Sequence, residues 1–150
     1  MVPMIFALVL QAAAPPLPPS PSVSRSIDGL PIGAIGKQAM PARGCAAYLW
    51  TVAGTPQMVA MAGADPAQLR IAVDGVAKDY ARSSQSGAGG FGFAGVTEYR
   101  GGDVTATVDM TITTRGDMTQ GATVAPATLR IERPGHDIVV IPVGGLIGCV

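Results

Sequence analysis

Residues 104–114 read VTATVDMTITT, and this stretch decides the fold class. Its apolar residues fall on alternate positions, and threonine or aspartate fills most of the positions between them. A period of two is the pattern of a β-strand with one buried and one solvated face, and β-branched threonine suits the solvated face of a pleated sheet. The stretch therefore predicts a long strand in an antiparallel sheet, because such sheets commonly face water on one side.

Further candidate strands lie upstream, at residues 45–52, 57–62, 67–74, 76–82 and 96–100. Residues 45–52 are apolar at nearly every position, which is typical of a strand covered on both faces. Asp74-Gly75 separates two of the candidates and matches a two-residue hairpin turn, since both residues tolerate positive φ. A helix over residues 66–72 with Asp65 as its N-cap is the alternative for one of them.

Downstream candidates occupy residues 122–124, 127–133 and 138–143. The last is a continuous apolar run and predicts a buried strand. Short strands with turn signals every 8 to 12 residues are typical of all-β domains. The sequence therefore predicts an all-β fold, a single antiparallel β-sandwich or small β-barrel of about 7–9 short strands.

The amino-terminal region predicts export. Residues 1–14 contain an apolar stretch that ends in small residues, as a signal peptide does, although no Lys or Arg precedes it. The stretch is too short to span a bilayer, so we expect a periplasmic or secreted protein with no transmembrane segment in its mature form. An ordinary buried apolar segment is the alternative. Residues 15–44 predict a Pro/Gly-rich linker and irregular arm, and residues 45–149 the β-rich globular domain.

The two cysteines, Cys45 and Cys149, stand near the two ends of the predicted domain. A cysteine pair in an exported chain predicts a disulfide. Closing a loop of about 100 residues contributes roughly 4–5 kcal/mol in the chain-entropy model. Two free buried thiols, or a reactive thiol activated by a cationic neighbour, are the alternatives.

Charge and composition argue against several functions. Lys and Arg number 10 and Asp and Glu number 10. They are interspersed, so there is no basic patch to attract nucleic acid. The only histidine, His136, cannot by itself build a histidine-rich metal site, and no cysteine or carboxylate group has ligand spacing. We therefore expect no metal and no cofactor.

A serine hydrolase would need a nucleophile beside a base. Ser83, Ser84 and Ser86 lie in a glycine-rich region, but the Gly-x-Ser-x-Gly motif is absent and His136 is the only imidazole. We therefore expect no catalytic residue and no enzyme activity.

The Ser/Gly-rich stretch 83–95 is the candidate partner-binding loop, with Ser86, Phe91 and Phe93 as its candidate contact residues. Two phenylalanines on an exposed loop can anchor in a pocket of another protein, whereas in a strand they would be core residues. Ser86-Gly87-Ala88 resembles a loop of bacterial c-type lysozyme inhibitors, which are small exported β proteins with a disulfide. The resemblance covers three residues, and Gly89 stands where those inhibitors usually have arginine, so no function is transferred.

These observations predict a non-enzymatic binding or interaction domain of a bacterial cell envelope. We expect it to bind an envelope protein or surface component through strand edges and the 83–95 loop. The alternative is a proteinaceous inhibitor of a periplasmic or secreted hydrolase such as a lysozyme or protease. The sequence leaves the oligomeric state open.

Overall fold

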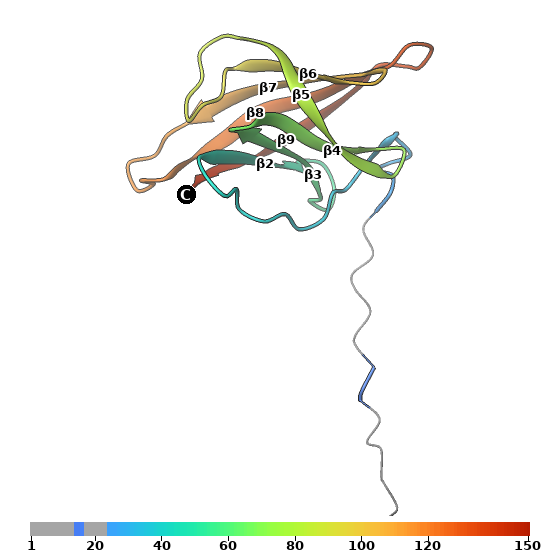
Figure 1. Cartoon of the computed structure of the whole chain (residues 1–150), viewed down its shortest axis with the longest axis horizontal. Helices are drawn as coiled ribbons and strands as arrows, with labels where there is room; N and C mark the ends of the chain where they lie inside the picture. Colours follow the sequence, from blue (N-terminus) through green and yellow to red (C-terminus); the bar gives the residue numbers. More distant parts are fainter. Residues whose placement is uncertain (1–13, 17–23) are drawn as a thin grey trace, which may run out of the picture.

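The computed structural model describes residues 14–16 and 24–150 of the chain (Figure 1). Residues 1–13 and 17–23, which hold most of the predicted leader and proline run, lie outside the described residues. The strands are β1 (Ile32–Gly33), β2 (Cys45–Thr51), β3 (Met58–Ala64), β4 (Ala67–Val73), β5 (Val76–Ser86), β6 (Val96–Gly101), β7 (Val104–Thr113), β8 (Gly121–Glu132) and β9 (Val139–Cys149).

Eight of these strands form a closed antiparallel barrel (Figure 1). Neighbours follow the order β4-β3-β2-β9-β8-β7-β6-β5, and the pairing of β4 with β5 closes the ring. The short β1 is the extra strand and pairs with the last residues of β4. The prediction of an all-β fold is confirmed, and of its two forms the barrel is the one observed. Closure gives most strands a neighbour on both sides, which removes the exposed edges of an open sheet.

The alternation that predicted β7 is confirmed. Val104, Ala106, Val108 and Met110 are at most 7% exposed, while the residues between them are half-buried or exposed. The side chains at every second position of the strand fill the barrel interior, as expected for a barrel of eight strands. Thus residues 104–113 form a wall with one dry and one solvated face.

The β4–β5 hairpin also follows the sequence prediction. Asp74 and Gly75 have φ of 52° and 80°, which is the two-residue turn that Asp-Gly favours. Residues 67–73 form a strand, so the helical alternative is wrong. Leu69 and Ile71 are completely buried, and such residues at every second position fit a strand facing a core.

The prediction of a continuously buried strand near the carboxyl terminus is wrong in part. β9 begins at Val139 and runs on through glycines to Cys149. Ile138 and Val140 are each 54% exposed, while Val139 and Ile141 are buried. The reason is that only one face of a barrel wall meets the core, so a continuous apolar run alternates between the core and solvent.

Two apolar side chains from irregular segments complete the core. Ile27 belongs to a tight turn over residues 27–32, and the Asp74 N–H donates to Pro31 O at 2.9 Å, which places this turn beside the β4–β5 turn. We call this end of the barrel the hairpin end. Phe93 enters the core from the loop after β5, at the opposite or loop end.

Residues 34–44 cross the outer surface of the barrel instead of hanging free. The Ile35 N–H donates to Met58 O at 2.8 Å, and the Tyr48 hydroxyl donates to Ala39 O at 3.1 Å. Tyr48 is only 6% exposed, so this segment explains why β2 is apolar on both faces. The carboxyl-terminal half of the predicted arm therefore packs on the barrel.

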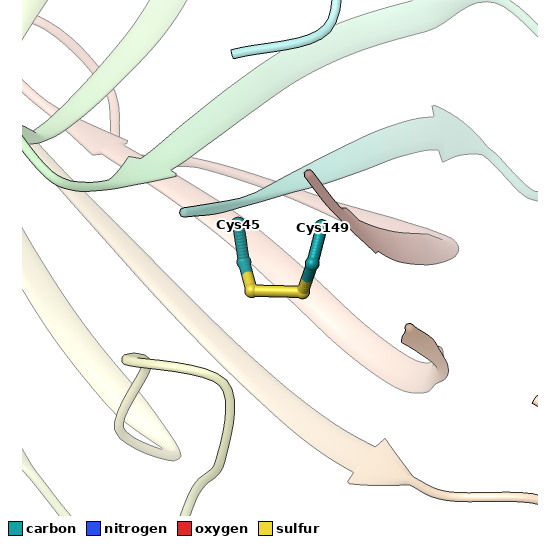
Figure 2. The surroundings of a disulfide bond; sticks show 2 residues. All are labelled: Cys45 and Cys149. Atoms are coloured by element: carbon teal, nitrogen blue, oxygen red, sulfur yellow. A yellow bond between two sulfur atoms is a disulfide. The ribbon is translucent and has the colours of Figure 1, made fainter. Parts of the chain in front are cut away.

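The predicted disulfide joins Cys45 and Cys149 with an S–S distance of 2.01 Å (Figure 2). The two cysteines are direct partners in the β2–β9 ladder. Val150 N–H donates to Gly44 O at 3.0 Å, so the cysteines form a non-hydrogen-bonded pair, where antiparallel strands approach most closely. Their Cα atoms lie 4.0 Å apart. A disulfide is compatible with an extracellular or periplasmic location.

Candidate functional site

The second half of β5 has an unpaired strand edge. β4 pairs with β5 only from Val76 to Ala81, and because β4 begins at Ala67, the rest of β5 extends past the end of β4 (Figure 1). Residues 83–86 still pair with β6 on one side, but within the described chain no backbone hydrogen bond is made from their other side. Their side chains are all exposed. The result is a four-residue strand edge open to solvent.

The loop that follows this edge is held in place by its own hydrogen bonds. Gly90 N–H donates to Phe93 O at 2.9 Å, and Phe93 N–H donates to Gly90 O at 3.0 Å. Phe91 lies between them with φ of 59°, a left-handed conformation that is rare outside glycine. The 87–95 loop is therefore a defined turn and not an open glycine-rich tether.

The predicted 83–95 loop is shorter in the structure, because residues 83–86 extend β5, and its three candidate contact residues differ in their surroundings. Phe93 is 8% exposed and belongs to the hydrophobic core, so its ring anchors the loop to the barrel. Phe91 is half-buried and packs against the edge of the core, whereas Ser86 is exposed at the end of β5. Ser86 and Phe91 are thus the candidate residues that remain accessible, and their role in partner binding stays a prediction.

Charged groups beside the open edge neutralise one another. Arg100 donates to a Glu98 carboxylate oxygen at 2.7 Å, and the Ser83 hydroxyl donates to the same oxygen at 3.0 Å. These hydrogen bonds, that of Arg100 first, lower the pKa of Glu98 below its usual value. Arg82 donates to Gln85 Oε1 at 3.0 Å. The edge therefore offers a partner backbone groups and hydroxyls more than net charge.

The structure does not bring the candidate serines to the histidine. His136 lies in the β8–β9 turn at the hairpin end, on the lining of a cavity that also contains Asp74. Asp74 lies two residues before β5, which begins at Val76 and ends at Ser86. At about 3.3 Å per residue, ten steps along a strand cover about 33 Å. Ser83, Ser84 and Ser86 lie towards the far end of this span from His136.

A groove of about 360 Å³ runs between residues 41–43 and the outer face of β3 and β4. Its charged groups are matched in pairs. Arg43 lies 3.2 Å from Asp65, and Arg70 makes two hydrogen bonds to Asp79, at 2.7 and 2.8 Å. The hydrogen bond to Asp79 raises the pKa of Arg70. Since these charges are already compensated, the groove presents mainly apolar surface.

A wider hollow of about 830 Å³ lies at the hairpin end, and we call it the bowl. Its walls come from the 25–31 segment, the β4–β5 turn and the β8–β9 turn. Sequence reasoning treated His136 as an isolated turn residue and missed this hollow. Its three walls are separated by some 40 to 110 residues along the chain, and no local pattern signals that they meet.

Neither a cluster of metal ligands nor a membrane-spanning helix occurs among the described residues. Between residues 24 and 150, no three His, Cys, Asp or Glu side chains gather as metal ligands would. A helix of the length and apolarity needed to cross a bilayer was likewise not found in the part of the chain that the structure describes.

Comparison with protein-family models, curated protein sequences and solved structures found no significant match for this chain.

Proposed function

We propose that this chain is an exported, non-enzymatic binding domain of the cell envelope that holds an extended segment of a partner protein along the open edge of β5. The observation that supports it most directly is the unpaired backbone edge of residues 83–86, whose side chains are all exposed. An exposed sheet edge is a ready template for an added strand, because main-chain hydrogen bonds supply affinity without a specific sequence.

The loop next to this edge supplies a second contact. Phe91 is held by the hydrogen-bonded turn from Gly90 to Phe93, so little conformational freedom is lost when a partner covers it. The edge itself carries small hydroxyl side chains at Ser83, Ser84 and Ser86, which leave room for an incoming strand. Backbone pairing and one aromatic contact together define the proposed binding surface.

Export is the other half of the proposal. The disulfide supports it, because such bonds persist in oxidising compartments. Intact-mass analysis of protein taken from the envelope and culture-medium fractions tests it. We expect a chain shortened by about 14 residues with no free thiol. A full-length chain with two free thiols in the cytoplasmic fraction would contradict export.

The binding edge is tested with a charge substitution. Ser84→Lys places a charge on the open edge, which is how natural proteins prevent strand addition. Thr128→Lys is the matched control, because Thr128 is an exposed residue of β8 that is paired with β7 on one side and with β9 on the other. In crosslinking with envelope extract, we expect wild type and Thr128→Lys to give the same adduct and Ser84→Lys to lose it. An adduct that survives in Ser84→Lys would overturn the proposal.

The inhibitor function is a second candidate, and the ordered 87–95 turn favours it. Protease and glycosidase inhibitors gain affinity when the inserted loop is rigid before binding. An assay of lysozyme and protease turnover with added protein distinguishes the two functions. Inhibition that Phe91→Ser relieves supports an inhibitor, and unchanged turnover leaves the binding domain as the proposal.

A further inference from the structure

The bowl at the hairpin end holds a group of side chains that the proposed edge-binding function does not use. On one side lie Arg25 and the turn after it, and on the other lie His136, Asp137 and Ile138. A volume of about 830 Å³ is within the usual range of ligand pockets, about 300–1,000 Å³. Figure 1 shows the amino-terminal wall, in blue, beside the β4–β5 turn.

One pair of charges in the bowl is already neutralised. Arg133 Nη1 lies 2.6 Å from a carboxylate oxygen of Asp74, and the Arg133 side chain is only 11% exposed. This short contact fixes the β4–β5 turn to the β8–β9 turn. It also leaves neither group available as the main site for a charged ligand.

Two opposite charges in the bowl have no such partner. Among the described residues, Arg25 and Asp137 make no ion pair and no side-chain hydrogen bond. Both line the same hollow without pairing with each other. A molecule with a negative and a positive group at its two ends would satisfy both.

Part of the bowl lining is aliphatic. Ile138 and Val140 are each 54% exposed, and Leu30 and Pro31 line the opposite wall. Exposed aliphatic side chains that are grouped in a hollow are typical of ligand-binding surfaces. A ligand for this site needs aliphatic side chains as well as two charged ends.

We infer that the bowl binds a short peptide with free ends and aliphatic side chains. Its carboxylate lies on Arg25, its ammonium group lies on Asp137, and its side chains cover Ile138 and Val140. Arginine pairs well with a carboxylate because its planar donors match the two oxygens. This site is separate from the β5 edge, since the two lie at opposite ends of the barrel.

The single histidine of the chain provides the assay. His136 is beside Asp137 on the bowl lining, so its imidazole NMR signals report on this site alone. The probes are the dipeptide Leu-Leu, N-acetyl-Leu-Leu, which lacks the ammonium group, and Leu-Leu amide, which lacks the carboxylate. We expect saturable shifts with Leu-Leu. Each blocked peptide should have a dissociation constant about tenfold higher, because it lacks one charged hydrogen bond.

Variants of Arg25 and Asp137 test which residue binds the carboxylate of the peptide and which binds its ammonium group. Arg25→Gln is expected to bind Leu-Leu and Leu-Leu amide equally, and Asp137→Asn to bind Leu-Leu and N-acetyl-Leu-Leu equally. Arg115→Gln and Asp117→Asn are the matched controls, because these residues form an exposed ion pair in the β7–β8 turn, at the loop end. We expect both controls to behave as wild type.

Three outcomes would overturn the inference: no saturable shift of His136, equal binding of all three peptides by wild type, or Arg25→Gln and Asp137→Asn behaving as the controls do. The dispersion of the amide spectrum shows in each case that the variant is folded. None of these outcomes bears on the β5 edge, so the two proposals can fail separately.

Discussion

At the scale of the residue, the core includes two buried side chains from irregular segments. Ile27 and Phe93 are 6% and 8% exposed and come from irregular segments at the two ends. Barrel strands leave both ends open, and an apolar side chain inserted at each end shields the interior from water. Phe93 was a candidate contact residue by sequence, and its burial shows that it instead anchors the 87–95 turn to the core.

Substitution of Phe93 tests this anchoring role. We expect Phe93→Ala to lower the free energy of unfolding by about 3–5 kcal/mol, the usual cost of truncating a buried phenylalanine. Phe91→Ala, at a half-buried position in the same turn, should cost clearly less. Urea denaturation monitored by tryptophan fluorescence measures both. Equal losses for the two variants would contradict the assignment of Phe93 as the anchor.

Buried tyrosines make the protein sensitive to high pH. Burial raises the pKa of Tyr99 above its usual value, and burial followed by the charge of Asp103 does the same for Tyr80. Above about pH 10 the unfolded chain releases these protons and the folded chain retains them. The folded state then binds more protons, so stability falls as pH rises.

Denaturation at increasing alkaline pH checks this expectation. The free energy of unfolding should decline from about pH 10 upwards, with tyrosinate absorbance appearing together with unfolding. Tyr99→Phe removes one of the groups and should make the decline shallower. A decline of the same steepness in Tyr99→Phe would show that Tyr99 does not contribute.

At the scale of the element, glycines let β9 fit closely against its neighbours. A Cβ on Gly145 would overlap the carbonyl oxygen of Tyr48 in β2, so only glycine allows the backbones to approach in this way. The same strand carries the second cysteine at its end. The glycine-rich part of β9 therefore holds the β2–β9 ladder, which the disulfide then closes.

A Cβ added at Gly145 is thus expected to disturb the pairing of β2 with β9. We expect Gly145→Ala to lower the thermal unfolding midpoint with a loss of roughly 1–3 kcal/mol, the usual cost of overpacking. Gly116→Ala is the control, since nothing lies within 4 Å of a Cβ at that position. A midpoint for Gly145→Ala no lower than that of Gly116→Ala would contradict this interpretation.

At the scale of the whole molecule, the disulfide ties the first and last strands of the ring. Cys45 and Cys149 are separated by 104 positions in sequence and are neighbours in the β2–β9 ladder. Nearly the whole domain lies within the covalent loop. In the chain-entropy model, a loop of this size constrains the unfolded state strongly.

Replacement of both cysteines by serine should therefore lower the free energy of unfolding by about 4–5 kcal/mol. Guanidinium denaturation with and without a reducing agent measures the effect. The reducing agent should destabilise wild type by a similar amount and leave Cys45→Ser/Cys149→Ser unchanged. If reduction leaves the wild-type midpoint in place, the disulfide does not contribute in the way described.

The fold class, most strands, the Asp74-Gly75 hairpin and the disulfide could be predicted from the amino-acid sequence. These features depend on local patterns, since a period of two in burial or a residue that tolerates positive φ can be read along the chain. Because the chain has two cysteines, only one intramolecular disulfide was possible. The exposed half of the run at 138–143 was missed because side-chain hydrophobicity alone does not tell which face meets the core.

Three features required the folded structure: the closure of the sheet, the point where β5 loses its partner, and the segments that meet at the bowl. Closure depends on β4 and β5 pairing over part of their length while β5 runs on, and a ring of strands is a property of all pairings together. The bowl joins Arg25 to Asp137 across more than a hundred positions. Contacts of this kind arise from the packing of the complete chain, and no periodicity along the sequence encodes them.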